Sequence, residues 1–275
     1  MSDNLPMLMD NQIALKIRRG YKKWFSANLQ RDMELLIFGH EGQPVIFFPT
    51  RMARFYDYED WGVINSLQEK ILAGKIQVYC IDSVDEESFY CKNIAPPERM
   101  KRHIQFEKYL LDELIPFIGK QNKNTALISA GCSLGAYHAV NFAFRHPHLF
   151  KKVIGLSGRY DLTLQMKFFD DLFGGYWDED IYYNMPGQYI HNLTGGLLIE
   201  ELRNLDIIFS IGVEDAFFEN NLLLSRTLHQ KSIPNILHLL DGEAHKAKYW
   251  GSYLKFTCKP WLIPPVKTPD KRGDL

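Results

Sequence analysis

The chain has 275 residues, an apolar fraction of 46% and a formal net charge of −1 at pH 7. This length and apolar content suffice for one large core, so we expect a single domain over residues 1–275. The balanced charge argues against a nucleic-acid partner. The basic cluster at residues 16–23 is the exception, and its default interpretation is a solvated surface.

No apolar run is long enough to span a bilayer, and the first residues lack a positive segment followed by an apolar core. The small number of cysteines suits a reducing compartment. We therefore expect a soluble cytoplasmic protein that uses no metal or other cofactor. A Cys80–Cys91 bridge stays open, whereas Cys132 is expected to be a small packing residue.

Apolar runs and turn signals predict the order of elements along the chain. The N-terminal part is expected to contain a strand at residues 33–38, a hairpin-like turn at 39–42, a strand at 44–48, a helix at 61–72, a strand at 76–81 and a long helix at 99–118. Further strands at 125–130, 206–213 and 235–240 alternate with helical segments. This alternation predicts the α/β class, with a mostly parallel sheet covered on both faces.

A Gly-x-Ser-x-Gly pattern, Gly-Cys-Ser-Leu-Gly at residues 131–135, lies between the strand at 125–130 and a helix-like segment. In this strand-turn-helix context the serine of the motif is exposed as a nucleophile, so Ser133 is the leading catalytic candidate. A β-carbon at Gly131 or Gly135 would clash with nearby backbone. The pentapeptide alone occurs by chance in about one chain in ten or fifteen of this length, so its context and partners carry the interpretation.

A serine hydroxyl is a weak nucleophile and needs a histidine base that a carboxylate orients, in the chain order Ser, Asp/Glu, His. The apolar run at residues 206–213 ends at Glu214 and Asp215. A carboxylate directly after a buried strand is held rigidly, so we prefer Asp215 and keep Glu214 as its alternative. Asp241 and Glu243 also follow a strand, but they would have to fold back to reach the base.

His245 is the expected base. It follows the acid in the chain and lies on a loop after the strand at residues 235–240, beside the same sheet edge. Of the nine histidines it alone combines these positions. His138, for example, lies on the helix after the serine, where we expect it to be packed or hydrogen-bonded.

With these residues the chain resembles the α/β-hydrolase esterases of the esterase D type, which include S-formylglutathione hydrolases and mycolyltransferases. The resemblance spans residues 33–261 and is carried by motifs at 44–49, 131–136, 153–158, 212–215 and 242–245. It implies the α/β-hydrolase fold and maps nucleophile, acid and base onto Ser133, Asp215 and His245. It also implies a small-molecule ester or thioester as the substrate.

The backbone N–H of Leu134 is expected to be one oxyanion donor, and the loop after the early strand is expected to supply the other from the N–H of Arg51. The chain departs from the family here, because Pro-Thr-Arg-Met stands at residues 49–52 where such esterases carry a His-Gly pair. The Arg51 guanidinium either reaches a substrate carboxylate or phosphate or, like that of Arg54, pairs with acids at residues 57–60.

Residues 159–202 break the alternation and are rich in aromatic and acidic side chains. We expect a small cap near Ser133, whose aromatic residues, Tyr160 and Trp177 among them, either line an acyl pocket or pack over the sheet. A homo-oligomer that uses these aromatic residues as its interface also stays open. The tail at residues 264–275 is expected to be loosely ordered.

The predicted function is hydrolysis of an ester or thioester by a Ser-His-Asp triad through an acyl-enzyme intermediate. Two alternatives stay open. An acyltransferase would use the same triad with an alcohol in place of water. A catalytically silent hydrolase-like binding scaffold would fit the missing His-Gly pair.

Overall fold

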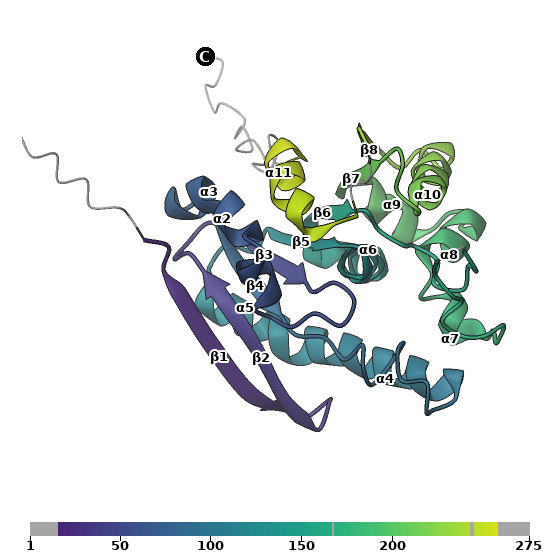
Figure 1. Cartoon of the computed structure of the whole chain (residues 1–275), viewed down its shortest axis with the longest axis horizontal. Helices are drawn as coiled ribbons and strands as arrows, with labels where there is room; N and C mark the ends of the chain where they lie inside the picture. The colour runs from purple at the N-terminus through teal and green to yellow at the C-terminus, as the bar shows by residue number, and fades with distance from the viewer. Residues whose placement is uncertain (1–15, 167, 243–244, 258–275) are drawn as a thin grey trace, which may run out of the picture.

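The computed structural model describes residues 16–166, 168–242 and 245–257 (Figure 1). Within these ranges one eight-stranded sheet has the order β1-β2-β4-β3-β5-β6-β7-β8. β2 runs antiparallel to both of its neighbours. The six strands β4, β3, β5, β6, β7 and β8 are parallel, which confirms the α/β class. The strands are β1 (Arg19–Ser26), β2 (Arg31–Phe38), β3 (Gln43–Phe48), β4 (Ile76–Ile81), β5 (Leu127–Cys132), β6 (Phe150–Leu156), β7 (Asp206–Gly212) and β8 (Asn235–Leu240).

The first strands differ from the expectation in two ways. β4 lies between β2 and β3, so the hairpin-like turn predicted at residues 39–42 is wrong. Part of the basic cluster at residues 16–23 forms the edge strand β1, in which Lys23 pairs with Asp32 of β2. Edge strands often carry exposed lysines. Their sequence pattern therefore resembles that of a solvated surface segment.

Helices cover both faces of the sheet (Figure 1). Successive strand residues point to opposite faces, so Val45 and Phe47 of β3 belong to one core cluster and Ile46 and Phe48 to another. The first cluster contains residues of α1 (Asp57–Asp60), α2 (Val63–Ser66), α3 (Gln68–Leu72) and α11 (Ala247–Thr257). The second contains residues of α4 (Pro96–Tyr109), α5 (Ile115–Gln121), α6 (Leu134–Arg145), α8 (Pro186–Asn192), α9 (Leu197–Arg203) and α10 (Phe218–Gln230).

Two helix predictions need correction. Residues 61–72 do not form one helix. Gly62, in a left-handed conformation with φ of 71°, precedes α2, and Leu67, with ψ of 1°, separates α2 from α3. The helix predicted at 99–118 is longer, and a π-helical turn, η1 (Leu110–Leu114), joins α4 to α5. That turn precedes Pro116, which has no N–H for the α-helical ladder and so favours a local change of helix type.

Residues 159–202 lie between β6 and β7 and contain α7 (Glu179–Tyr182), α8 and most of α9, after the short helix η2 (Pro147–Leu149) that precedes β6. Leu162 and Phe173 of this segment share a small core cluster with Phe89, Met100 and Leu134. The segment is thereby packed against α4 and the start of α6.

Three further expectations concern the cysteines, membrane-spanning helices and the C-terminal tail. Cys80, Cys91 and Cys132 are free thiols, which settles the open question of a Cys80–Cys91 bridge against it. Cys132 is fully buried in a core cluster, as a packing residue would be. In the described part of the chain, every helix is too short or too polar to cross a membrane. The tail at residues 264–275 and Glu243 lie outside the described residues.

Candidate active site

Ser133 occupies a sharp turn between β5 and α6. Its backbone adopts φ of 55° and ψ of −120°, a conformation that side-chain-bearing residues rarely adopt and that typifies a strained site. Its N–H donates a hydrogen bond of 2.8 Å to the carbonyl of Leu156 at the end of β6. The serine side chain is held at the carboxyl edge of the sheet and is only partly buried.

The two glycines of the motif allow backbone segments to approach each other closely. A β-carbon at Gly131 would lie 2.2 Å from the carbonyl oxygen of Gly135. A β-carbon at Gly135 would lie 2.3 Å from the carbonyl oxygen of Phe48. Both distances are far below van der Waals contact, so the predicted steric role of these glycines is confirmed.

Three predicted residues meet at this edge of the sheet. The Oγ of Ser133 lies 3.0 Å from Nε2 of His245, and Nδ1 of His245 lies 3.2 Å from Oδ2 of Asp215. Asp215 is 4% exposed, and its other oxygen accepts the N–H of Phe217 at 3.0 Å. Glu214 and Asp241 are exposed at the surface. The carboxylate in contact with the histidine is therefore that of Asp215.

Two aromatic rings border the His245 imidazole. The ring centroid of Phe217 lies 5.1 Å from that of His245, and the centroid of Phe169 lies 6.0 Å away. The two phenyl rings also contact each other, with centroids 4.5 Å apart. They restrict the imidazole to orientations that keep both of its nitrogens on their polar partners.

A buried tyrosine joins the loop after β3 to the serine turn. The hydroxyl of Tyr58 donates to the carbonyl of Phe48 at 2.8 Å and accepts the N–H of Cys132 at 3.1 Å. Leu134 is the first residue of α6, where backbone N–H groups lack an intrahelical acceptor. The loop that carries Arg51 thus begins beside the same turn. Nothing in the sequence pattern singled out Tyr58.

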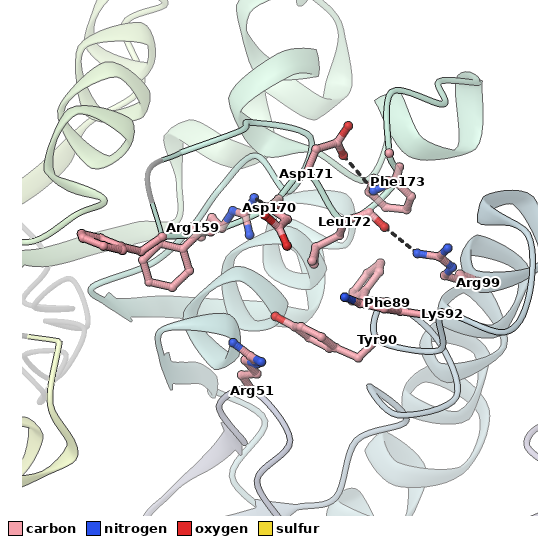
Figure 2. Close-up of a pocket in the computed structure, with 13 residues that line it drawn as sticks. Arg51, Phe89, Tyr90, Lys92, Arg99, Arg159, Asp170, Asp171, Leu172 and Phe173 are labelled. Atoms are coloured by element: carbon pink, nitrogen blue, oxygen red, sulfur yellow. Dashed lines mark hydrogen bonds between the residues drawn. The ribbon is translucent and has the colours of Figure 1, made fainter.

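A pocket of about 320 Å³ (Figure 2) is lined in part by Phe169, which also contacts the His245 ring. Phe168, Phe169, Leu172 and Phe173 contribute to its lining, so phenylalanines of the segment at residues 159–202 do face a cavity. The two named aromatics lie elsewhere. Tyr160 is fully buried in the core, and Trp177, which is 58% exposed, contacts the ring of Tyr182.

The two arginines of the loop after β3 behave differently. The Arg54 guanidinium pairs with Asp82 at 2.9 Å and with Glu34 at 2.9 Å, so its expected ion pair with acids at residues 57–60 is wrong; only its backbone N–H donates to Asp57. Arg51 makes no ion pair in the described ranges and instead lies over the ring of Tyr90, 4.9 Å from its centroid. Arg51 and Arg159 both line the pocket. Arg159 was not predicted, although its place three residues after the end of β6, at the same sheet edge, is a usable signal.

His138 is hydrogen-bonded as expected. Its Nε2 lies 2.9 Å from Oδ1 of Asp85, and both side chains are almost completely buried. The pair lies among the rings of Phe48, Phe89 and Phe106. It belongs to the packing behind α6 rather than to the pocket.

The family model described as "Putative esterase" matches residues 26–255. A ferulic acid esterase structure is similar over 88% of this chain and 98% of its own, with 15% identity and a TM-score of 0.68. An S-formylglutathione hydrolase from Agrobacterium tumefaciens is similar over 88% of this chain and 94% of its own, with 16% identity and a TM-score of 0.66. A fluorophosphonate-binding serine hydrolase from Staphylococcus aureus is similar over 87% and 96%, with 15% identity and a TM-score of 0.65. No curated protein sequence matches this chain. These structural similarities confirm the α/β-hydrolase fold.

Proposed function

The chain belongs to the esterase family and is an ester-hydrolysing enzyme, and we propose that it works as a serine esterase through Ser133, His245 and Asp215. The observation that carries this proposal is the continuous contact from the Ser133 hydroxyl through both imidazole nitrogens to a buried carboxylate. In hydrolases of the Ser-His-Asp type this arrangement activates the nucleophilic serine.

In the first half of the reaction, His245 accepts the Ser133 proton at Nε2 while Oγ attacks the ester carbonyl carbon. Asp215 holds the Nδ1–H tautomer and stabilises the imidazolium that forms. The tetrahedral intermediate then collapses, the imidazolium returns its proton to the leaving alkoxide or thiolate, and the acyl group stays on Ser133. An alcohol or thiol leaves.

In the second half, water donates a proton to His245 and attacks the acyl carbon. As the second intermediate collapses, the imidazolium returns its proton to the Ser133 Oγ, which restores the hydroxyl and releases a carboxylic acid. We propose that the backbone N–H groups of Leu134 and of Arg51, in the loop beside it, stabilise the oxyanion in both halves. The contacts of Tyr58 and Gly135 with that loop support this assignment.

The substrate class proposed here is a small-molecule ester or thioester. The α/β-hydrolase fold serves many reactions, so the substrate has to be argued from the site. The pocket of about 320 Å³, whose lining residue Phe169 contacts the His245 ring, is at the small end of ligand-binding cavities. It accommodates a small acyl or alcohol group rather than a polymer chain.

The test is intact-mass labelling with a fluorophosphonate on wild type, Ser133→Ala, His245→Ala and Ser157→Ala. Ser157 is a matched control, because it also follows a strand of the sheet and has a positive φ, of 50°. One adduct on wild type and Ser157→Ala that is lost in the other two variants is the expected result. An adduct that persists in folded Ser133→Ala would refute the assignment, and no adduct on folded wild type would favour the binding scaffold.

A further inference from the structure

Arg159 carries a buried positive charge in the wall of the pocket. The residue is 4% exposed, and within the described ranges its guanidinium forms no ion pair. One terminal nitrogen donates to the backbone carbonyls of Leu164 and Asp170, each at 2.7 Å. Its Nε is buried without a hydrogen-bond partner in the described structure. Burial lowers the pKa of Arg159, which reflects the cost of keeping this charge out of water.

Arg51 faces the same hollow from the opposite side. Its guanidinium lies over Tyr90, and Figure 2 shows the hydroxyl end of Tyr90 lying between Arg51 and Arg159. Burial raises the pKa of Tyr90 to about 12, and the two arginines oppose that rise. Two guanidinium groups and one phenolic O–H thus face the same part of the pocket.

The acids of the pocket do not neutralise these cations directly. Asp171 accepts the backbone N–H groups of Phe173 and Gly175, so its charge is used within its own turn. The contact between Arg159 and Asp170 is to the carbonyl of Asp170 and not to its carboxylate. Among the described residues that line the pocket, four are basic and two acidic, which leaves an excess of two positive charges.

The cationic side of the pocket is continuous with the proposed catalytic residues. Phe169 lines the pocket and also contacts the His245 ring. Arg159 lies three positions after Leu156, whose carbonyl binds the N–H of Ser133. An ester bound at Ser133 can therefore extend an anionic group towards Arg51 and Arg159.

We infer that the substrate carries a carboxylate, held between the guanidinium groups of Arg51 and Arg159 with the Tyr90 hydroxyl as a third donor. This inference rests on the proposed esterase function. Planar guanidinium groups present paired donors that match a carboxylate, and such charge-assisted hydrogen bonds are about twice as strong as neutral ones. A bound carboxylate would also give Arg159 a direct ionic partner, which it lacks among the described residues, where Asp161, Asp170 and Asp171 act on it only electrostatically.

Two matched ester pairs test the inference, one for each side of the scissile bond. The acyl-side pair is mono-p-nitrophenyl adipate and p-nitrophenyl hexanoate, which differ only in a terminal carboxylate. The alcohol-side pair is para-acetoxybenzoate and para-acetoxybenzamide. In at least one pair we expect the acidic ester to have a kcat/KM about ten- to a hundredfold higher, and this preference should weaken in high salt.

The variants Arg51→Gln and Arg226→Gln separate a local site from a general charge effect. Arg226 is exposed on α10, lies outside the pocket lining and undergoes the same change of charge. We expect Arg51→Gln to lower the ratio of acidic to neutral kcat/KM by about tenfold and Arg226→Gln to leave it unchanged. Arg159→Lys should lower the ratio as well, and circular dichroism on each variant reports whether it is folded.

Three results would overturn the inference. The first is a ratio at or below one in both pairs, and the second is a ratio unchanged in folded Arg51→Gln. The third is loss of the preference in millimolar inorganic phosphate but not in acetate. That result would show that the site binds phosphate rather than a carboxylate.

If no ester is turned over and no fluorophosphonate adduct forms, the proposed function fails separately. Calorimetric binding of adipic acid monoamide against hexanamide then decides the anion site alone. Preference for the acid that is lost in Arg51→Gln supports the site, and equal binding rejects it.

Discussion

The N–H of Cys132 donates to the hydroxyl of Tyr58 at 3.1 Å, and the same hydroxyl donates to the carbonyl of Phe48 at 2.8 Å. One phenol therefore satisfies two buried backbone groups on the neighbouring parallel strands β5 and β3. These strands lead into the Ser133 turn and into the loop of Arg51. The separation of the two proposed oxyanion donors depends on this contact.

Replacing Tyr58 by phenylalanine should destabilise the protein by about 1–3 kcal/mol, because two buried polar groups lose their partner. Urea unfolding measures the loss, as a lower midpoint with an unchanged slope. Tyr109→Phe is the matched control, since the Tyr109 hydroxyl is buried and has no partner in the described structure. Its removal should be close to neutral, and equal losses in both variants would contradict the bridging role.

Gly135→Ala should abolish esterase activity and destabilise the fold. The new β-carbon would lie 2.3 Å from the carbonyl oxygen of Phe48 and 2.7 Å from that of Pro49, so the serine turn and the loop after β3 would have to separate. Gly119→Ala in α5 is the control, because its β-carbon meets open space. That change should stabilise the protein by about 0.4–1 kcal/mol. Thermal unfolding and turnover of a p-nitrophenyl ester measure both effects.

Asp215→Asn and Glu214→Gln form a second matched pair at adjacent positions. Loss of the carboxylate at 3.2 Å from the His245 Nδ1 should lower kcat by about 10⁴-fold, because the amide favours the wrong imidazole tautomer. Glu214 is exposed, and Glu214→Gln should change kcat less than about twofold. A large loss of kcat in Glu214→Gln, with full activity in Asp215→Asn, would show that Glu214 is the residue that orients His245.

Phe169→Ala should lower kcat/KM by about two- to tenfold, since the contacts of Phe169 with Phe217 and with the His245 ring are lost. It should also shift the preference among acyl chain lengths, because Phe169 lines the pocket. Trp177→Ala removes an exposed aromatic that is absent from the lining and should alter neither value. Rates with acetyl, butyryl and hexanoyl esters compare the two variants.

His103 should make the protein less stable in acid. Burial and the neighbouring His138 lower the pKa of His103 to about 3, and the opposing effect of Glu107 is smaller. Because the pKa is lowered in the folded state, the unfolded chain binds the extra proton as pH falls from about 6.5 towards 3. Over that window His103 should contribute a loss of up to about 1.4 kcal/mol per pH unit.

Urea unfolding from about pH 7 to pH 4 should therefore show a shallower loss in His103→Phe than in wild type. Phe106→Leu, in the neighbouring core, is the control, because it destabilises the protein without removing a titrating group. Equal pH slopes in wild type and His103→Phe would contradict this origin of the acid sensitivity.

Local pattern was sufficient for much of the fold. β4 and β8 have the predicted bounds, since each is a short apolar or alternating run closed by turn residues. The strand-turn-helix at Ser133 and the steric role of Gly131 and Gly135 also follow from neighbouring residues alone. Such features depend on backbone sterics and burial over a few positions, which a sequence states directly.

The tertiary structure decided what depends on distant segments. It placed β4 between β2 and β3 and set the carboxylate of Asp215, rather than that of Glu214, against His245. It also separated Arg54, which forms ion pairs, from Arg51, which forms none with the described residues and lies over Tyr90. Tyr58 and Arg159 gained their significance only there. These relationships are made by side chains far apart in the chain, whose packing and charge pairing are properties of the whole fold and leave no periodic signal in the sequence.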